Sequence, residues 1–445
     1  LNVRLHNQKA ISYASTPYST VNDYHCMLLN NKYKKLLPTK DYLIDEVVLL
    51  NAWKKSHQHI RGVNWYVDYL DLDMSALELE SRIKALTTAI DNKILRLTPL
   101  QLIPAPKSHP WTFIPPSAES ATSNVIKWEP NEITPKVEGF IPPIQPLRPL
   151  AHVSIDDQTL FTALMMLLAS NVETKQGDPS TGLKKVHDNK VINYGNRLHC
   201  TYRDDHEATY SWGNSNTYSK YFQDYQQFLA RPIYFGREAN KIKTNEEQIY
   251  EVHLDFAKFY DSINRVKLLE NISELVQEMT GSKPDDYVQH VLDQFLDWKW
   301  TKKSKQLYAS VCRNEDIPKL KNRMGIPQGL VAGGFFANLY LLKFDEKIFK
   351  LIGEHFASDN EVILVDACRY VDDLRLIVKA KKKPENEKYL TNLITEEFKT
   401  ITTKLGINLN LQETKTKVKV FSSKEGAISA KLADIQSKVS GPLPL

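Results

Sequence analysis

The run from Ile363 to Val378 constrains the fold of this chain most strongly. In it, two apolar segments flank the polar tip Tyr370-Val371-Asp372-Asp373. Apolar segments on either side of a short polar turn predict a β-hairpin. The hairpin would hold adjacent carboxylates at its turn, where like charges repel each other unless cations neutralise them. The other Asp-Asp pairs lie outside any apolar hairpin: Asp156-Asp157, Asp204-Asp205 and Asp285-Asp286.

A further acid lies upstream, in the run Val252-His-Leu-Asp255-Phe-Ala-Lys-Phe-Tyr260. This run predicts a short buried strand that ends at Asp255 and turns into a helix. Facing the hairpin acids, Asp255 would complete the oxygen cage that Mg²⁺ prefers, a few carboxylates together with substrate phosphates. Two such ions about 3.5–4 Å apart activate an attacking hydroxyl and stabilise the leaving oxygen of a phosphoryl transfer. The two segments indicate polymerase or nuclease chemistry.

Between these segments lies a glycine-rich loop that opens a long apolar helix, Gly325-Ile-Pro-Gln-Gly-Leu-Val-Ala-Gly-Gly334. Glycines let a backbone approach a ligand closely. The order Asp255, Gly-Ile-Pro-Gln-Gly, Tyr-Val-Asp-Asp resembles motifs A, B and C in the palm of a reverse transcriptase. The run from Leu405 to Val418 is similar to the fourth palm motif of that family. The resemblance covers approximately residues 145–425.

Three segments resemble the bacterial reverse transcriptases of the abortive-infection and phage-defence groups. They are Arg148 to Gln158, Tyr194-Gly-Asn-Arg-Leu198 and the Gly-Leu-Val-Ala-Gly-Gly-Phe form of the second motif. This resemblance implies a setting in antiviral defence. The chain departs from the family at Gly333, where the family usually carries serine, and no adjacent residue supplies a hydroxyl.

The resemblance also implies roles for individual residues. Asp255, Asp372 and Asp373 would be the catalytic acids and, with Phe256, the metal site for two Mg²⁺ ions, for which Mn²⁺ is a substitute. Tyr260, five residues after Asp255, would exclude a ribose 2′-hydroxyl and so select deoxynucleotides. The remaining nucleotide-binding candidates are Arg148, Gln328, Gly329 and Lys415, and the primer or template candidates are Tyr370, Gly325 and Pro327. Arginine suits its role because it is always charged and presents a planar fork to phosphate.

Composition excludes several other classes of protein. The four cysteines are far apart in the sequence, which argues against a zinc site or a disulfide scaffold and favours a reducing cytoplasm. No apolar run approaches the length of a membrane span and no phosphate-loop motif is present, so we expect neither membrane insertion nor an ATPase. The net charge is only +5, but lysines cluster at 302–305, 379–383 and 415–419, beside the candidate catalytic segments. This clustering favours contact with phosphates.

We expect an α+β fold, a right-hand polymerase palm and fingers behind a mainly helical N-terminal extension. The expected domains are the extension with its proline-rich connector (1–130), the fingers (131–240), the palm (241–425, with inserted helices at 265–322) and the start of a C-terminal or thumb region (426–445). The thumb would be short, unusual or truncated.

Local signals refine this expectation. Proline disfavours regular ladders, so the connector should be extended, with one candidate strand at 125–128. Ser75-Ala-Leu-Glu78 predicts a capping box, and a helix should begin after Ser154. Aromatic residues among basic ones make the segment 190–240 a candidate contact for single-stranded nucleic acid.

The sequence thus predicts an RNA-directed DNA polymerase that adds dNTPs to a primer 3′-hydroxyl, with an RNA template and a DNA product. One alternative is a template-independent or protein-primed nucleotidyltransferase on the same fold. Another is a non-catalytic nucleic-acid-binding relic, although a site that no longer held metal would gain stability by losing its mutually repelling acids. The template, priming mode, product, oligomeric state and any further C-terminal domain or partner protein stay open.

Overall fold

The computed structural model describes residues 31–62, 68–106, 111–114, 127–130, 147–203, 206–311, 325–356, 359–383, 386–407, 409–412 and 415–422. Side chains are described for these residues except at positions 31, 104–148 and 307–311. The chain divides into two units, Leu1–Leu36 and Leu37–Leu445. The first contributes one described element, the short helix η1 (Asn31–Lys34), and every element below belongs to the second. No helix among the described residues has the length and apolarity needed to cross a membrane.

The described part of the N-terminal extension is helical, as predicted. Its helices in the second unit are α2 (Lys40–Leu43), α3 (Glu46–Arg61), α4 (Tyr69–Leu77) and α5 (Leu79–Asp91). The predicted capping box is wrong, because Ser75 is buried inside α4. Its hydroxyl donates to the carbonyl of Leu72 (2.7 Å) and accepts from the indole N–H of Trp53 (3.0 Å), so tertiary contacts use the group that capping would need.

The proline-rich connector forms two short antiparallel ladders, which corrects the expectation of an extended segment without them. Strand β1 (Gln101–Pro106) pairs with β4 (Leu147–His152), and β2 (Trp111–Ile114) pairs with β3 (Lys127–Pro130). Pro104 and Pro149 even lie opposite each other. Both sheets are two-stranded, so each strand has an open edge where a missing N–H breaks no ladder. Of the strand predicted at 125–128, Lys127 and Trp128 lie in β3, and the first two residues fall outside the described part of the chain.

The long helix α6 (Ile155–Gln176) begins where predicted, with Ser154 as its N-cap accepting from the amide of Asp157 (3.2 Å). Helix α3 packs along it, and the Ser56 hydroxyl donates to the Thr162 hydroxyl (2.8 Å). After α6 come η3 (Leu183–Lys185), the paired strands β5 (Cys200–Tyr202) and β6 (Ala208–Tyr210), and α7 (Tyr221–Ile242). The N-terminal extension is therefore joined to the central helix of the expected fingers.

A five-stranded antiparallel sheet forms the centre of the expected palm, in the order β11-β7-β10-β9-β8. Its strands are β7 (Glu247–Asp255), β8 (His355–Phe356), β9 (Asp359–Tyr370), β10 (Asp373–Lys381) and β11 (Lys417–Val420). The described helices between β7 and β8 are α8 (Phe259–Ser262), α9 (Arg265–Thr280), α10 (Asp286–Gln294), α11 (Lys302–Val311) and α12 (Gly333–Phe349), and α13 (Asn386–Lys404) follows β10. The predicted strand ending at Asp255 and the predicted hairpin are both confirmed.

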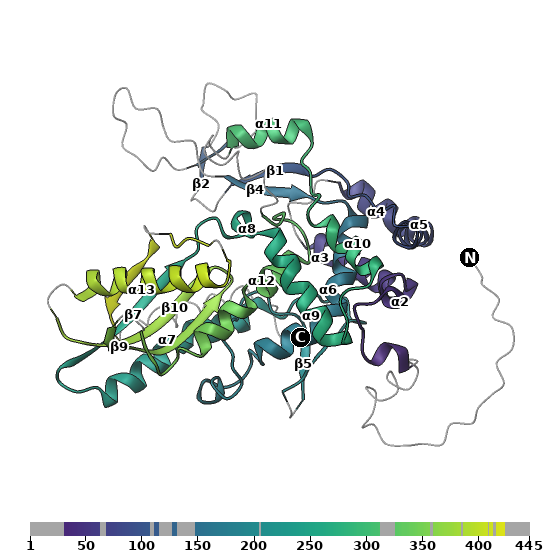
Figure 1. Ribbon diagram of the computed structural model, residues 1–445. Helices are drawn as coiled ribbons and strands as arrows, with labels where there is room; N and C mark the ends of the chain where they lie inside the picture. The colour runs from purple at the N-terminus through teal and green to yellow at the C-terminus, as the bar shows by residue number, and fades with distance from the viewer. Residues whose placement is uncertain are drawn as a thin grey trace, which may run out of the picture. The chain divides into compact units, whose positions relative to one another are not determined.

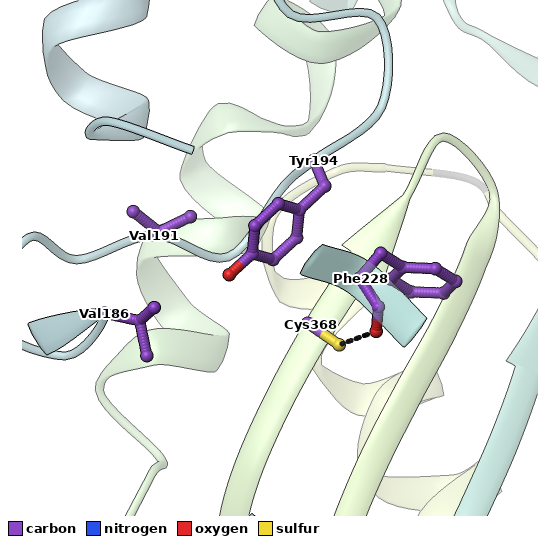
Figure 2. Packing of buried hydrophobic residues seen from close by; sticks show 5 residues of the cluster. All are labelled: Val186, Val191, Tyr194, Phe228 and Cys368. Atoms are coloured by element: carbon purple, nitrogen blue, oxygen red, sulfur yellow. Dashed lines mark hydrogen bonds between the residues drawn. The ribbon is translucent and has the colours of Figure 1, made fainter. Parts of the chain in front are cut away.

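Helices cover both faces of this sheet (Figure 1). On one face Phe256 packs against Phe344 of α12, which in turn packs against Phe398 of α13, with ring centroids 5.6 and 5.9 Å apart. On the other face lies α7, and the thiol of Cys368 donates to the carbonyl of Phe228 (3.8 Å), as Figure 2 shows. Because both sides of β9 and β10 are packed, the hairpin tip is held by a rigid support.

Candidate active site

The three candidate catalytic acids lie at one end of the sheet. Asp255, the last residue of β7, is the register partner of Asp373, the first residue of β10. Asp373 also pairs with Tyr370 across the hairpin, which leaves Val371 and Asp372 as its two-residue turn. The amide of Phe256 donates to the carbonyl of Asp372 (3.2 Å), which joins the end of β7 to the tip. Acids that are more than a hundred positions apart in the sequence are thus brought together.

The turn is strained at Val371, which has a φ of 58°. A hairpin turn with a positive φ at its first central residue usually places glycine there. A β-branched residue in this region is an outlier that costs on the order of 1–3 kcal/mol. The buried guanidinium of Arg369 stabilises the turn by donating to the Val371 carbonyl (2.7 Å) while it forms an ion pair with Asp345 (2.6 Å).

A second segment supports the tip from outside the hairpin. A Cβ on Gly195 would lie 2.4 Å from the amide nitrogen of Val371, so only glycine permits this close approach. The Asn338 side chain donates to the carbonyls of Gly195 (2.8 Å) and Asn196 (3.1 Å). Sequence reasoning assigned no role to Arg369 or Asn338, and grouped Gly195 and Asn196 only within a family-like segment. Their contacts are all distant in sequence, so no local pattern signals them.

Asp255 and Asp373 each lie next to a positively charged side chain. Lys415 Nζ is 2.9 Å from Asp255 Oδ2, and Arg375 Nε is 3.3 Å from Asp373 Oδ1. Burial, and then the charge of Asp255, raise the pKa of Asp372. The Lys415 side chain is 62% exposed, so its ion pair contributes little to stability and is readily exchanged.

The described residues include no group of three or more His, Cys, Asp and Glu side chains already arranged around a metal position. Two of the three acids are turned to Lys415 and Arg375 instead. The donors themselves fit a hard divalent cation: they are carboxylate oxygens, close enough together for Asp255 to act on Asp372. Phe256 is 1% exposed as a whole residue, and because its side chain carries no donor atom, its backbone carbonyl is the group that it could offer as a ligand.

Tyr260 lies in α8, directly after the end of β7. Its hydroxyl accepts from the Asn196 side chain (3.2 Å). Burial, and then the charge of Asp372, raise the pKa of Tyr260 to about 12, so the phenol keeps its proton. The predicted gate residue therefore lies beside the acids with its ring held in place.

The predicted Gly-Ile-Pro-Gln-Gly loop lies between Tyr260 and β4. Ile326 donates its amide to the Tyr260 carbonyl (3.0 Å), and the Gln328 carbonyl accepts from the amide of Ala151 (2.6 Å). Gly325 and Gly329 have φ values of +81° and +126°, and a Cβ on Gly329 would lie 2.2 Å from the Ala151 carbonyl oxygen. These glycines are thus required by backbone geometry.

The remaining predicted residues lie around this loop. Pro327 is buried within it. Arg148 is on β4, two positions before Leu150, which bridges to Gln328; its side chain is outside the described part. The side chain of Gln328 forms no hydrogen bond with any residue that the structure describes. The backbone of the loop and the strand that carries Arg148 thus lie side by side.

Tyr370 continues into a row of aromatic rings on α7. Its ring lies edge-on to that of Tyr225, with centroids 5.0 Å apart, and it also contacts Phe228 at 5.7 Å. Tyr221, one helical turn before Tyr225, is 65% exposed, and Tyr225 is 38% exposed. Exposed rings therefore lead away from the acidic tip.

Comparisons with known proteins agree with this geometry. The reverse transcriptase (RNA-dependent DNA polymerase) family model matches residues 197–430, more than half of the 445-residue chain. This span includes the acids, the glycine-rich loop and the whole described sheet. No curated protein matches the chain.

Among solved structures, the chain is similar to apo telomerase from Candida tropicalis. The TM-score is 0.35 at 11% identity, and the match covers 84% of this chain and 64% of that one. A form of the same telomerase truncated from its C-terminal domain gives a TM-score of 0.31 at 12% identity, with 73% and 52% covered. The chain spans less than two thirds of either structure. On the family match, the chain belongs to the reverse transcriptase (RNA-dependent DNA polymerase) family, and its α+β architecture is the right-hand polymerase fold.

Proposed function

We propose that this protein is an RNA-directed DNA polymerase that adds dNTPs to a primer 3′-hydroxyl. The observation that carries the proposal is the pairing of Asp255 with Asp373 beside the hairpin turn that contains Asp372. Reverse transcriptases generally use divalent metal ions. We propose Mg²⁺, with Mn²⁺ as a substitute, held by Asp255, Asp372, Asp373 and the Phe256 carbonyl. When bound, two such ions activate the attacking hydroxyl and stabilise the leaving oxygen.

The other residues position the substrate. Lys415 is exposed and lies 2.9 Å from Asp255, so it can turn from the carboxylate to the triphosphate and give a proton to the leaving pyrophosphate. The ring of Tyr260, fixed by Asn196, would stand against a 2′-hydroxyl. Gln328 presents an amide with no partner among the described residues to the incoming nucleotide or its template base. Such a reaction depends mainly on positioning and electrostatics.

The row Tyr370, Tyr225 and Tyr221 supports contact with unpaired bases. Stacking of a base on an aromatic side chain contributes about 1–3 kcal/mol and tolerates any sequence. We expect the affinity for a primed RNA template to fall with rising salt, because bound lysines release counterions from the phosphates.

A templated reaction is tested by nucleotide dependence. The protein is mixed with Mg²⁺ and each dNTP singly, on primed poly(rA) and then on primed poly(rC). We expect dTTP alone to extend the first primer and dGTP alone to extend the second. Incorporation that ignores the template would contradict the proposal.

A protein-primed or template-independent transferase is the second candidate. The observation that favours it is the 65% exposure of Tyr221, which lies on the same helix as Tyr225, the residue whose ring contacts Tyr370 of the hairpin. It predicts that labelled nucleotide stays on the denatured protein without any template, and that Tyr221→Phe removes the label. If the label appears only in DNA that is not attached to the protein and depends on a template, the result supports the RNA-directed DNA polymerase.

The proposed biological setting is bacterial antiviral defence. It is supported by the similarity of Arg148 to Gln158 and of Tyr194 to Leu198 to the defence-associated reverse transcriptases. Bacteria that express the protein should resist phage, and those that express the Asp372→Asn, Asp373→Asn variant should not. Equal plating of phage on both strains and on a strain without the protein would contradict this role.

A further inference from the structure

The buried side chain of Gln158, near the start of α6, bridges two peptide groups of the glycine-rich loop. Its Nε2 donates to the Gly329 carbonyl (2.8 Å), and its Oε1 accepts from the Val331 amide (2.7 Å). The residue is only 1% exposed. A primary amide donates through its nitrogen and accepts through its oxygen at the same time, whatever the pH.

The loop backbone is also held at Gln328 and Val331 by two other segments. The Gln328 carbonyl accepts from Ala151 (2.6 Å), and the Val331 carbonyl accepts from the Tyr218 hydroxyl (2.6 Å). The side chain of Val331 is buried in a cluster with Ile60 and Leu72 of the N-terminal helices. The loop therefore has an anchored inner side, to which Gln158 contributes both hydrogen-bonding ends of its amide.

The outer side of the same loop is open. Gly329 is exposed, and the Gln328 side chain forms no hydrogen bond with the described residues. The side-chain amide of Gln328 is thus available to a ligand, while the backbone of the next residue, Gly329, is fixed by Gln158. Sites of this kind lose selectivity when the supporting residues loosen, because small displacements misplace the contacting group.

Support from the N-terminal extension reaches Gln158 directly. The Ser56 hydroxyl of α3 lies 3.3 Å from the Gln158 carbonyl oxygen and donates to Thr162 (2.8 Å). The first turn of α6 is therefore braced from behind while its Gln158 side chain holds the loop in front.

We propose that Gln158 is a positioning residue for nucleotide selection, fixing the loop so that Gln328 and Gly329 meet the incoming dNTP and its template base. The proposal rests on the proposed polymerase function. Gln158 itself touches no substrate. It acts through the Gly329 and Val331 peptide groups.

Gln158→Met tests this role, since methionine has a similar shape and lacks both hydrogen-bonding groups. The matched control is Gln294→Met in α10, another buried glutamine, whose amide donates, within the part of the chain that the structure describes, to the His290 carbonyl of its own helix (3.2 Å). We expect Gln158→Met to raise the KM for the correct dNTP by about ten- to a hundredfold, with a smaller change in kcat and more misincorporation. Gln294→Met should leave all three unchanged at a similar unfolding midpoint.

Hydrogen exchange gives a readout that needs no activity. The Val331 amide should be protected in the wild type and in Gln294→Met, and should exchange faster in Gln158→Met. Unchanged exchange in Gln158→Met overturns the proposal, as does faster exchange with an unchanged KM and fidelity. A wild type that incorporates no nucleotide removes the polymerase function and the selection role with it, and the exchange result still decides whether Gln158 holds the loop.

Gln158→Glu separates the amide from its volume. An ionised carboxylate keeps the acceptor for Val331 and repels the Gly329 carbonyl, whereas a protonated one restores the donor. We compare the KM of Gln158→Glu with that of the wild type at the same pH. The ratio of the two KM values should approach one as the pH falls from about 8 to about 6, because burial favours the neutral carboxyl. A ratio that does not change with pH overturns the role of the donor.

Discussion

The guanidinium of Arg369 donates to the carbonyl of Val371 at 2.7 Å, and through this contact a buried ion pair supports a strained turn. Arg369 lies on β9 and pairs with Asp345 of α12, the helix that the glycine-rich loop opens. The acidic tip and the loop therefore share one support. Strain at a tip so held is typical of functional sites, where the surrounding structure overdetermines the backbone.

Gly195→Ala should damage the active site more than its size suggests. The added Cβ would lie 2.4 Å from the Val371 amide, so the tip must move. We expect incorporation to fall by at least roughly tenfold, in line with the about 1–3 kcal/mol cost of overpacking. Gly182→Ala is the control, because no atom lies within 4 Å of its added Cβ. Equal activity of the two variants in primer extension would contradict the close contact.

Gly333→Ser restores the hydroxyl that the family usually carries, and we expect it to fold as the wild type does. The nearest atom to an added Cβ is 3.5 Å away, an ordinary contact, and the position opens α12. Serine has the higher helix propensity, so the free energy of unfolding should rise by up to about 0.5 kcal/mol. Denaturant unfolding measures the change, and a marked loss of stability would show that the position needs glycine.

Tyr260→Val should relax discrimination against ribonucleotides, because it removes the ring that is expected to meet a 2′-hydroxyl. We expect the ratio of rNTP to dNTP incorporation to rise by at least roughly tenfold, about 1.4 kcal/mol of lost discrimination. Tyr260→Phe keeps the ring and loses only the contact with Asn196 (3.2 Å), so it should stay close to wild type. If Tyr260→Val leaves the ratio unchanged, the ring only packs.

Stability should depend on pH through Asp157. Burial raises the pKa of Asp157 to about 6, above the roughly 3.9 of an unfolded aspartate. The folded state thus binds the proton more tightly, and this stabilisation is lost as pH rises through about 6. Asp157→Asn cannot ionise and keeps an acceptor for the Thr98 amide (2.9 Å in the wild type).

At pH 8 the Asp157→Asn variant should be more stable than the wild type, by on the order of 1–3 kcal/mol. The difference should vanish below about pH 4, where both states of the wild type are protonated. Denaturant unfolding at several pH values checks this. A gap that is constant with pH would place the titrating group elsewhere.

The sequence predicts the parts of the site that local patterns encode. Apolar segments specify the strand that ends at Asp255 and the two strands of the hairpin, and a short polar run specifies the turn between Tyr370 and Asp373. The positive φ values of Gly325 and Gly329 agree with the prediction of a glycine-rich loop here, because glycine adopts this backbone conformation most readily.

Contacts between distant segments could not be predicted in this way. Nothing near Gln158 in the sequence reveals that its side chain holds the glycine-rich loop. Nothing near Gly195 reveals that the hairpin turn packs against it. Ser75 was misread for the same reason, since Trp53, 22 positions away, uses its hydroxyl. The domain boundaries stay a prediction. Helix α3 packs along α6, so contacts cross the boundary expected near residue 130.

The central claim is that Asp255, Asp372 and Asp373 form a metal-dependent polymerase site. Its most direct test is dTTP incorporation on primed poly(rA) with Mg²⁺ by the wild type, by Asp372→Asn combined with Asp373→Asn, and by Asp286→Asn. Asp286 is an acid of another Asp-Asp pair, 86% exposed and paired with Lys93, so its loss should not matter. We predict that the double variant loses at least roughly a thousandfold in rate, because the carboxylates that would hold the ions are gone. Its unfolding midpoint should equal or exceed that of the wild type, since two repelling charges are removed.

Incorporation by the folded double variant at the wild-type rate would contradict the account.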